Sequence, residues 1–368
     1  MTAFALYRLP FAQHYTRVEQ TDGDPDEMWS LESLNGRRGF VFAPFVPSPA
    51  CPILLIRPDK VSSMQVRTLP DIGKQPTAMF ESDDREAYSA NFALFHSHIL
   101  AGHFQKIVLA RQRTVSAPTK PTSLQLFARA CLLYPRMFVA LVSTRRSGQW
   151  LAATPEVLLK GGHGQWSSMA LAGTMPAQDS RNISSKCDPA DISNISPKCS
   201  PALADSACQG IVWSAKNIRE QRYVATYIAE SLTPFVTDFK ERGPYTSRAC
   251  RLLHLRSDFT FTLRDEDRLG NVLDVLHPTP AVCGLPKQQA LSFIQAHESE
   301  PRRYYSGFLG PLDMEGLTHL CVSLRCMELT AEGYRLYAGG GLVGDSCEDG
   351  EWRETEAKMA TMGEVIGL

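Results

Sequence analysis

No run of apolar residues in this 368-residue sequence approaches the roughly 20 that a membrane-spanning helix needs. Residues 1–17 mix charged side chains with Pro10 and His14, so the apolar core of a signal peptide is missing as well. We therefore expect a protein that makes no membrane contact and stays in the cytoplasm.

An excess of charge of one sign is also missing. The sequence has 38 Lys and Arg residues against 39 Asp and Glu residues, for a formal net charge of -1. A nearly neutral chain has no general field that attracts polyanions, so a nucleic-acid partner is not expected.

Close cysteine spacing is missing too, although the sequence contains 10 cysteines. No CxxC pair or short Cys/His cluster occurs, which argues against a disulfide framework and against a structural zinc site. Zinc binding stays open for Cys187, Cys199 and Cys208, which fall in one stretch of the chain. Reduced thiols are the simpler interpretation.

The sequence does contain enough apolar residues for a substantial core, at 43% of the chain. Short β-like runs alternate with amphipathic segments, which predicts an α+β fold. Strands are expected at 106–111, 137–143, 149–153, 157–160, 259–264, 304–309, 317–328 and 334–338. Helices are expected at 124–133, 217–237, 269–276, 287–296 and 351–365, with Ser123 as the N-cap of the first and Pro286 beginning the fourth.

One segment, 177–210, differs in composition from the rest of the chain. It is rich in Ser, Asp, Pro and Cys, and the pattern NISSKCDPA (182–190) returns as NISPKCSPA (194–202). Such a polar segment predicts an exposed, disordered insertion without a functional role.

Glu220 stands where an apolar side chain is expected. It shares a helix face with Val224 and Ile228, so it points inward and needs a cation. From the spacing alone, that cation could be an arginine from elsewhere in the chain or a metal ion.

Two further groups of charged residues have two interpretations each. Glu351, Glu354 and Lys358 share one face of the last predicted helix, which indicates either a solvated ion-paired face or a site. Arg325 lies on the polar side of the predicted strand 317–328, where it could grip a carboxylate or remain a surface arginine.

The glycine run GGGLVG (339–344) follows a predicted strand and matches GxGxxG, the pattern of dinucleotide-binding folds. Only residues 345–368 follow it, which leaves no room for the second strand and its ribose-binding acid. Backbone amides that receive a carboxylate are the better interpretation, because glycine lets a ligand approach the main chain closely.

Nine short motifs appear in order along the chain: KIVLAR (106–111), ATPEVLL (153–159), LAGT (171–174), HL (254–255), HPTPAVCGLPK (277–287), YYSGFLG (304–310), SLRC (323–326), LYAGGGLV (336–343) and EWRETEAK (351–358). The series, within residues 92–363, resembles that of the chorismate-utilising enzymes, which include isochorismate synthase, anthranilate synthase component I, aminodeoxychorismate synthase component I and salicylate synthase. The resemblance implies a single α+β domain over 1–368, with two mostly antiparallel sheets packed face to face, helices outside and the site between them.

The resemblance also implies a reaction. Isochorismate forms from chorismate when water attacks C2 and the C4 hydroxyl leaves in protonated form. Lys106 matches the family's general base, which activates the water, and Glu156 matches the acid that protonates the departing hydroxyl. Glu156 then needs a pKa above the ordinary glutamate value, which burial favours.

By the same resemblance, Glu220 and Glu354 match the family's metal ligands. Mg²⁺ is expected there, because it takes one or two protein carboxylates together with substrate oxygens. Glu351 is expected beside the pair and not on the metal.

The substrate contacts follow from the same motifs. The pyruvyl carboxylate is expected between Arg325 and backbone amides of the glycine run, and Lys358 is expected near the metal. The residues implied around chorismate are Gly173, His254, Ala281, Arg325, Tyr337, Gly339, Gly340 and Lys358.

Within the family, the sequence favours an isochorismate synthase, an isomerase. Lys106 fits water as the nucleophile, whereas ammonia-using branches generally lack this lysine and carry a motif ending in GAPK in place of HPTPAVCG. Salicylate synthase is the alternative, although its members tend to have threonine at Ala281. A non-catalytic binding protein that keeps the fold is the alternative from another functional class.

The expected protein is a monomer without an obligatory protein partner, and its product is a precursor of menaquinone or of siderophores.

Two positions depart from the family pattern. Gln221 stands where the motif around Glu220 usually continues with histidine, and Met175 begins a stretch that is basic in some relatives. The first departure puts in doubt any supporting role of position 221 beside the metal ligand.

Overall fold

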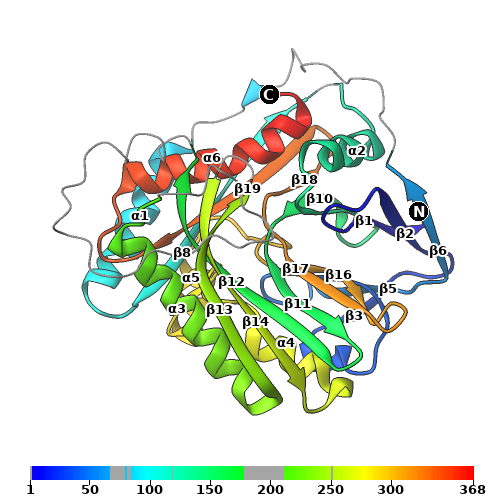
Figure 1. The fold of residues 1–368 in the computed structure, drawn as a ribbon. Coiled ribbons are helices and arrows are strands. Elements are labelled where there is room, and N and C mark those ends of the chain that lie inside the picture. The colour runs from blue at the N-terminus through cyan, green and yellow to red at the C-terminus, as the bar shows by residue number, and fades with distance from the viewer. Residues whose placement is uncertain (1, 67–78, 81–83, 118, 178–210, 250–251) are drawn as a thin grey trace.

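The computed structural model describes residues 2–66, 79–80, 84–117, 119–177, 211–249 and 252–368, and in them two antiparallel sheets are packed together (Figure 1). The first sheet has ten strands, with β7 paired to β8 and the others in the order β15-β8-β19-β18-β10-β9-β1-β2-β6. Their bounds are β1 Ala3–Arg8, β2 His14–Gln20, β6 Lys60–Gln65, β7 Met79–Phe80, β8 Lys106–Ser116, β9 Phe138–Thr144, β10 Gly148–Thr154, β15 Gly284–Leu285, β18 Cys326–Leu329 and β19 Gly333–Leu342.

The second sheet has nine strands among the described residues, in the order β13-β14-β12-β11-β17-β16-β4-β5-β3. Their bounds are β3 Asp26–Met28, β4 Gly39–Ala43, β5 Ile53–Ile56, β11 Val157–Gly162, β12 Gln165–Pro176, β13 Val236–Ala249, β14 Leu252–Leu263, β16 Phe308–Leu312 and β17 Thr318–Val322.

Six α-helices lie among the described residues: α1 Arg85–Leu100, α2 Ser123–Leu133, α3 Ala215–Leu232, α4 Leu269–Leu276, α5 Lys287–His297 and α6 Glu348–Ile366. One apolar core joins the facing sides of the two sheets, as Phe138 and Met169 illustrate. A second core packs α3 and α4 on the outer face of the second sheet, and a third packs α2 and α6 on that of the first. Figure 1 shows α6, in red, across the first sheet, and α3, in green, beside the second. The predicted fold class and the outer position of the helices are confirmed.

Local sequence signals explain where the helices begin and end. The Thr122 side chain accepts a hydrogen bond from the Gln125 amide at 3.3 Å, and the Gln125 side chain accepts one from the Thr122 amide at 2.8 Å. Thr122 is therefore the N-cap of α2, and the prediction of Ser123 was wrong by one residue. Helix α6 ends at Gly367, whose φ of 87° is the left-handed conformation common at this position.

The chain passes directly from one sheet to the other at two places that bear on function. Strand β10 of the first sheet continues into β11 of the second through Pro155 and Glu156, and β17 of the second continues into β18 of the first through 323–325. The crossings are tied together, because the Val322 amide donates to the Glu156 carbonyl at 2.9 Å and the Ala153 amide donates to the Arg325 carbonyl at 3.0 Å.

The second crossing corrects two predictions. The expected strand 317–328 is two strands in different sheets, with Arg325 between them at a φ of 45°, so Arg325 does not lie on the polar side of a strand. Alternation could not reveal the break, because both Leu320 and its neighbour Cys321 are fully buried. The expected strand at 304–309 begins only at Phe308, after a turn.

The prediction also missed or misplaced other elements. Helix α1 and strands β1–β7, β12, β13 and β15 were not expected. The helix predicted for 217–237 ends at Leu232, where a 3-10 turn (Thr233–Phe235) leads into β13. Most of the polar segment 177–210, with Cys187, Cys199 and Cys208, lies outside the described residues. None of the described helices combines the length and apolar content that a membrane crossing requires.

Candidate active site

A cavity between the two sheets gathers most of the charged residues that the sequence singled out. Its walls come from both crossings, from β12, β14 and β19, and from α3 and α6. The predicted residues that line it are Glu156, Gly173, Glu220, His254, Ala281, Arg325, Tyr337, Gly339, Glu354 and Lys358.

Glu156 lies on the first crossing and is 2% exposed. Burial raises the pKa of its carboxyl group to about 8, although the ammonium groups of Lys106 and Lys358 pull the pKa the other way. A carboxyl group with this pKa is mostly protonated at neutral pH. Glu156 can therefore donate a proton into the cavity, as a general acid must.

Arg325 lies on the second crossing and is held from two sides. Its guanidinium donates to Thr361 Oγ1 at 3.1 Å and contacts His254 Nε2 at 3.3 Å. A guanidinium can only donate, so Nε2 accepts and the neutral ring carries its proton on Nδ1. Burial, together with the charges of Arg325 and Lys358, holds the pKa of His254 well below its usual value. His254 is thus an uncharged residue that positions Arg325.

Three lysine–glutamate ion pairs surround strand β19. The nitrogen–oxygen distances are 2.8 Å for Lys106–Glu220, 2.6 Å for Lys358–Glu354 and 2.6 Å for Lys216–Glu351. Each carboxylate of the cluster therefore has a cation beside it. The cation that inward-facing Glu220 required is a lysine of this chain, not an arginine.

The pKa values of the glutamates respond differently to this environment. Burial alone would raise the pKa of Glu220, but the ammonium groups of Lys106, Lys358 and Lys216 outweigh it and hold the pKa below its ordinary value. Burial and the nearby charge of Glu354 raise the pKa of Glu351. Glu220 is therefore a carboxylate at neutral pH.

Strand β19 can carry this cluster only because positions 339–341, just before its end, are glycines. A Cβ atom on Gly341 would collide with Glu220 Oε1, and one on Gly340 would lie 2.8 Å from Glu351 Oε2. The two glycines therefore let carboxylates from α3 and α6 approach opposite sides of the strand. The glycine run serves close packing of charged groups and not a dinucleotide turn.

The residues present fit a magnesium ion when substrate completes the shell. Glu220 and Glu354 line the same cavity and offer hard oxygen donors. Among the described residues, no group of three or more His, Cys, Asp or Glu side chains is arranged to hold a metal. Two carboxylates without a third protein ligand suit Mg²⁺, which commonly keeps water and substrate oxygens in its shell.

A profile of the chorismate binding enzyme family matches residues 56–364. The chain belongs to the chorismate-binding enzymes. Every wall of the cavity described above falls inside the matched range.

Two curated relatives are similar to this family member over most of its length. The salicylate biosynthesis isochorismate synthase of Pseudomonas aeruginosa is 32% identical over 79% of this chain and 58% of its own. Isochorismate synthase EntC of Escherichia coli K12 is 29% identical over 72% of this chain and 62% of its own. The chain therefore spans less than two thirds of the length of these relatives.

Two solved structures share the fold of this chorismate-binding enzyme. MenF, the menaquinone-specific isochorismate synthase from Escherichia coli, matches with a TM-score of 0.77 at 22% identity, over 100% of this chain and 89% of that one. Anthranilate synthase component I from Streptococcus pneumoniae matches with a TM-score of 0.67 at 16% identity, over 98% and 92%. At these identities the likeness concerns the fold alone.

Three predicted residues lie differently from the others. Lys106 does not form part of the cavity wall and reaches it through its contact with Glu220. Gly340 faces Glu351 instead of the cavity. The ring of Tyr337 lines the cavity, but its hydroxyl contacts Glu328 Oε2 at 3.4 Å, away from the crossings.

Two residues of the site were missed from the sequence. Lys216 forms the third ion pair, and its position one turn before Glu220 on α3 was the signal that could have found it. Gln221 is fully buried and binds β12 next to its β-bulge: its side-chain oxygen accepts from the Ala172 amide at 2.9 Å and its nitrogen donates to the Ala170 carbonyl at 3.2 Å. Gln221 thus fixes the turn of α3 that carries Glu220.

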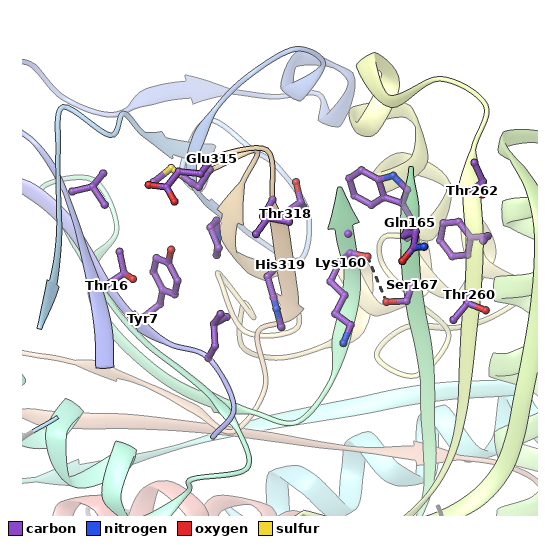
Figure 2. Close-up of a pocket in the computed structure, with 18 of the residues that line it drawn as sticks. Tyr7, Thr16, Lys160, Gln165, Ser167, Thr260, Thr262, Glu315, Thr318 and His319 are labelled. Carbon is purple, nitrogen blue, oxygen red and sulfur yellow. Dashed lines mark hydrogen bonds between the residues drawn. The ribbon is translucent and has the colours of Figure 1, made fainter. Parts of the chain in front are cut away.

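A larger groove, of about 970 Å³, opens elsewhere between the sheets (Figure 2). We call it the open groove; its labelled lining includes Tyr7, Lys160, Glu315 and His319. Lys160 and Glu315 are exposed, and hydroxyl groups make up much of the rest of its lining. Its size exceeds that of the cavity. Burial raises the pKa of Tyr7 and lowers that of His319 to about 4, but Lys160 and Glu315 are exposed, unlike the buried ion pairs around the cavity.

Proposed function

We propose that this chain is an isochorismate synthase, which converts chorismate to isochorismate. The observation that carries the proposal is Glu156, a buried carboxyl group whose pKa is raised to about 8 and which faces a cavity that also contains the cations Arg325 and Lys358. A dianionic substrate needs those cations, and its departing hydroxyl needs a proton donor. The names of the relatives described above agree with this reaction.

The proposed step uses one acid and one base. The uncharged amine form of Lys106 takes a proton from a water molecule as the water oxygen bonds to C2, the ring double bonds shift from C1–C2 and C5–C6 to C1–C6 and C4–C5, and the C4–O bond breaks. Glu156 gives its proton to the departing hydroxyl, which leaves as water. One water enters and one leaves, so the reaction is an isomerisation. Arg325, held by His254, is suited to bind the pyruvyl carboxylate in a forked contact.

Glu220 and Glu354 are proposed to hold Mg²⁺. When bound, the ion supplies positive charge that neutralises the ring carboxylate of the substrate. The cavity has only about 60 Å³ of free space, so substrate binding has to open it. The Lys106–Glu220 and Lys358–Glu354 ion pairs would have to exchange partners when the ion and the substrate bind.

Product analysis tests the proposal. Purified protein is incubated with chorismate and Mg²⁺, without ammonia, and the products are separated by chromatography. Isochorismate as the sole product is the expected result, and chelation of the metal should abolish its formation. Salicylate with pyruvate would instead indicate a salicylate synthase, and turnover that requires ammonia would reject the proposal.

A further inference from the structure

A hollow of about 320 Å³ lies next to the active cavity, between it and the open groove. It shares Pro155 and Leu171 with the active cavity, and Lys160 and His319 with the open groove. Figure 2 shows Lys160 and His319 extending from neighbouring strands in the same direction. The three spaces therefore follow one another along the inner face of the second sheet.

The register of the second sheet supports this continuity. On β14, His254 lines the active cavity and Arg256, two residues later on the same face, lines the hollow. Arg256 pairs across the sheet with Leu171, which lines both spaces and is 8% exposed. A ligand in the hollow would thus be one side-chain layer away from the site of the proposed reaction.

The lining of the hollow is strongly cationic. It includes Arg136, Lys160, Arg248 and Arg256, and no Asp or Glu occurs among its described lining residues. Arg256 is balanced by Asp258, to which it donates at 2.8 and 2.6 Å. Lys160 makes no ion pair with any described carboxylate, which leaves uncompensated positive charge beside the opening.

Two of these cations stand at the mouth. Arg136 and Arg248 are exposed, and both also line an adjoining hollow of about 260 Å³ that shares Pro155. Clefts lined by charge of one sign concentrate oppositely charged ligands and speed their association. The relevant ligand for this protein is a small dicarboxylate.

We propose that the hollow lined by Arg136, Lys160, Arg248 and Arg256, here called the arginine vestibule, captures the dianionic substrate and passes it over Pro155 and Leu171 into the active cavity. The inference rests on the proposed function, since it takes chorismate as the dianion. It adds an approach path and residues that never touch the reacting atoms.

Association kinetics test the capture role. Glu156→Gln serves as the parent, because it should bind chorismate without consuming it. Stopped-flow tryptophan fluorescence then gives the association and dissociation rates at saturating Mg²⁺. Addition of Arg136→Gln and Arg248→Gln should lower the association rate about fivefold at low salt. The difference should fall below about twofold at 0.5 M salt, where screening is nearly complete. The dissociation rate should fall in parallel, so that Kd hardly changes.

Two controls separate charge from structure. The double variant Arg136→Lys with Arg248→Lys keeps both charges and should retain the parent rates. Arg145→Gln removes an exposed arginine that does not line the vestibule and should change nothing.

The possible outcomes are distinct. Unchanged association in the glutamine variant, or an equal loss in the lysine variant, would overturn the capture role. A weaker Kd that arises from faster dissociation alone would do the same, because the arginines would then touch bound substrate. A parent that binds no chorismate would contradict the proposed function and this role with it, whereas a parent that binds with arginine-independent rates would leave the proposed function standing.

Discussion

The active cavity and the open groove lie between the same two sheets, yet they differ in what surrounds their charged groups. On the cavity wall, Glu156 is 2% exposed, and Lys106, which reaches the cavity through Glu220, is fully buried. In the groove, Lys160 and Glu315 are exposed. Charge in a buried setting has to be paired or neutralised, which moves pKa values, whereas exposed charge is screened by water. Burial, and not volume, thus marks the chemical site.

The largest expected effect comes from removing the carboxyl group of Glu156 in the cavity, with removal of the carboxyl group of Glu315 in the open groove as the comparison. Glu156→Gln keeps the shape but removes the proton donor, so kcat should fall about 10³-fold. Glu315→Gln makes the same chemical change in the open groove and should leave kcat within about twofold. Steady-state isochorismate formation measures both. An equal fall in kcat for the two substitutions would contradict the assignment of the catalytic acid to the cavity.

The sequence predicted the acid and most of the cavity through short motifs, but not the reason for their convergence. Glu156 and Arg325 meet because each lies where the chain changes sheets, and hydrogen bonds between the crossings hold them together. Hydrophobic alternation cannot show such a crossing when residues on both sides of the strand are buried, as at Leu320 and Cys321.

The supporting residues were harder to predict for a related reason. Gln221 matters because it satisfies an amide at a bulge between Ala172 and Thr174, and a bulge depends on the register of strands far apart in sequence. Lys216 matters because it reaches Glu351, which is 135 residues away. Helices and single strands follow from local pattern, but contacts of this range do not.

A smaller loss is expected from a change to Arg325, the cation on the second crossing. Arg325→Lys keeps the charge but loses the forked donors and the contact with His254. The value of kcat/KM should fall about 10- to 100-fold, mostly through KM. Arg145→Lys, at an exposed position, is the matched control. An unchanged KM for Arg325→Lys would contradict the proposal that Arg325 binds the pyruvyl carboxylate of the substrate.

The pH profile should also separate the cavity from the groove. Because the pKa of Glu156 is raised to about 8, its proton is present below that pH and is lost as the pH rises above it. The rate should therefore hold up to about pH 8 and then fall by up to tenfold per pH unit. Glu315→Gln should show the same descending limb. A profile that keeps rising through pH 9 would argue against Glu156 as the acid.

The same raised pKa has a consequence for stability. The folded state holds a proton on Glu156 between the ordinary glutamate pKa and about pH 8, while the unfolded state does not, so the free energy of unfolding declines over that range. Glu156→Gln removes this dependence and should stabilise the protein at pH 7 by up to about 3 kcal/mol. Thermal melts at pH 5 and pH 8 measure it: the substitution should raise Tm by a few degrees at pH 8 and by less at pH 5. A lower Tm at both would mean that the carboxyl group is not held neutral by burial.

The smallest effect is expected where a cavity residue turns its polar atom away from the cavity. Tyr337 OH contacts Glu328, which keeps ion pairs with Arg303 and Arg335 when the hydroxyl is removed. Tyr337→Phe should therefore change kcat/KM by less than about threefold and stability by less than about 1 kcal/mol. Tyr305→Phe is the contrast, because the Tyr305 hydroxyl points toward Gly339 on the cavity wall: a Cβ atom on Gly339 would lie 2.9 Å from it. A fall in kcat/KM of more than tenfold for Tyr337→Phe would contradict this. It would mean that the Tyr337 hydroxyl leaves Glu328 and contacts the substrate when the substrate binds.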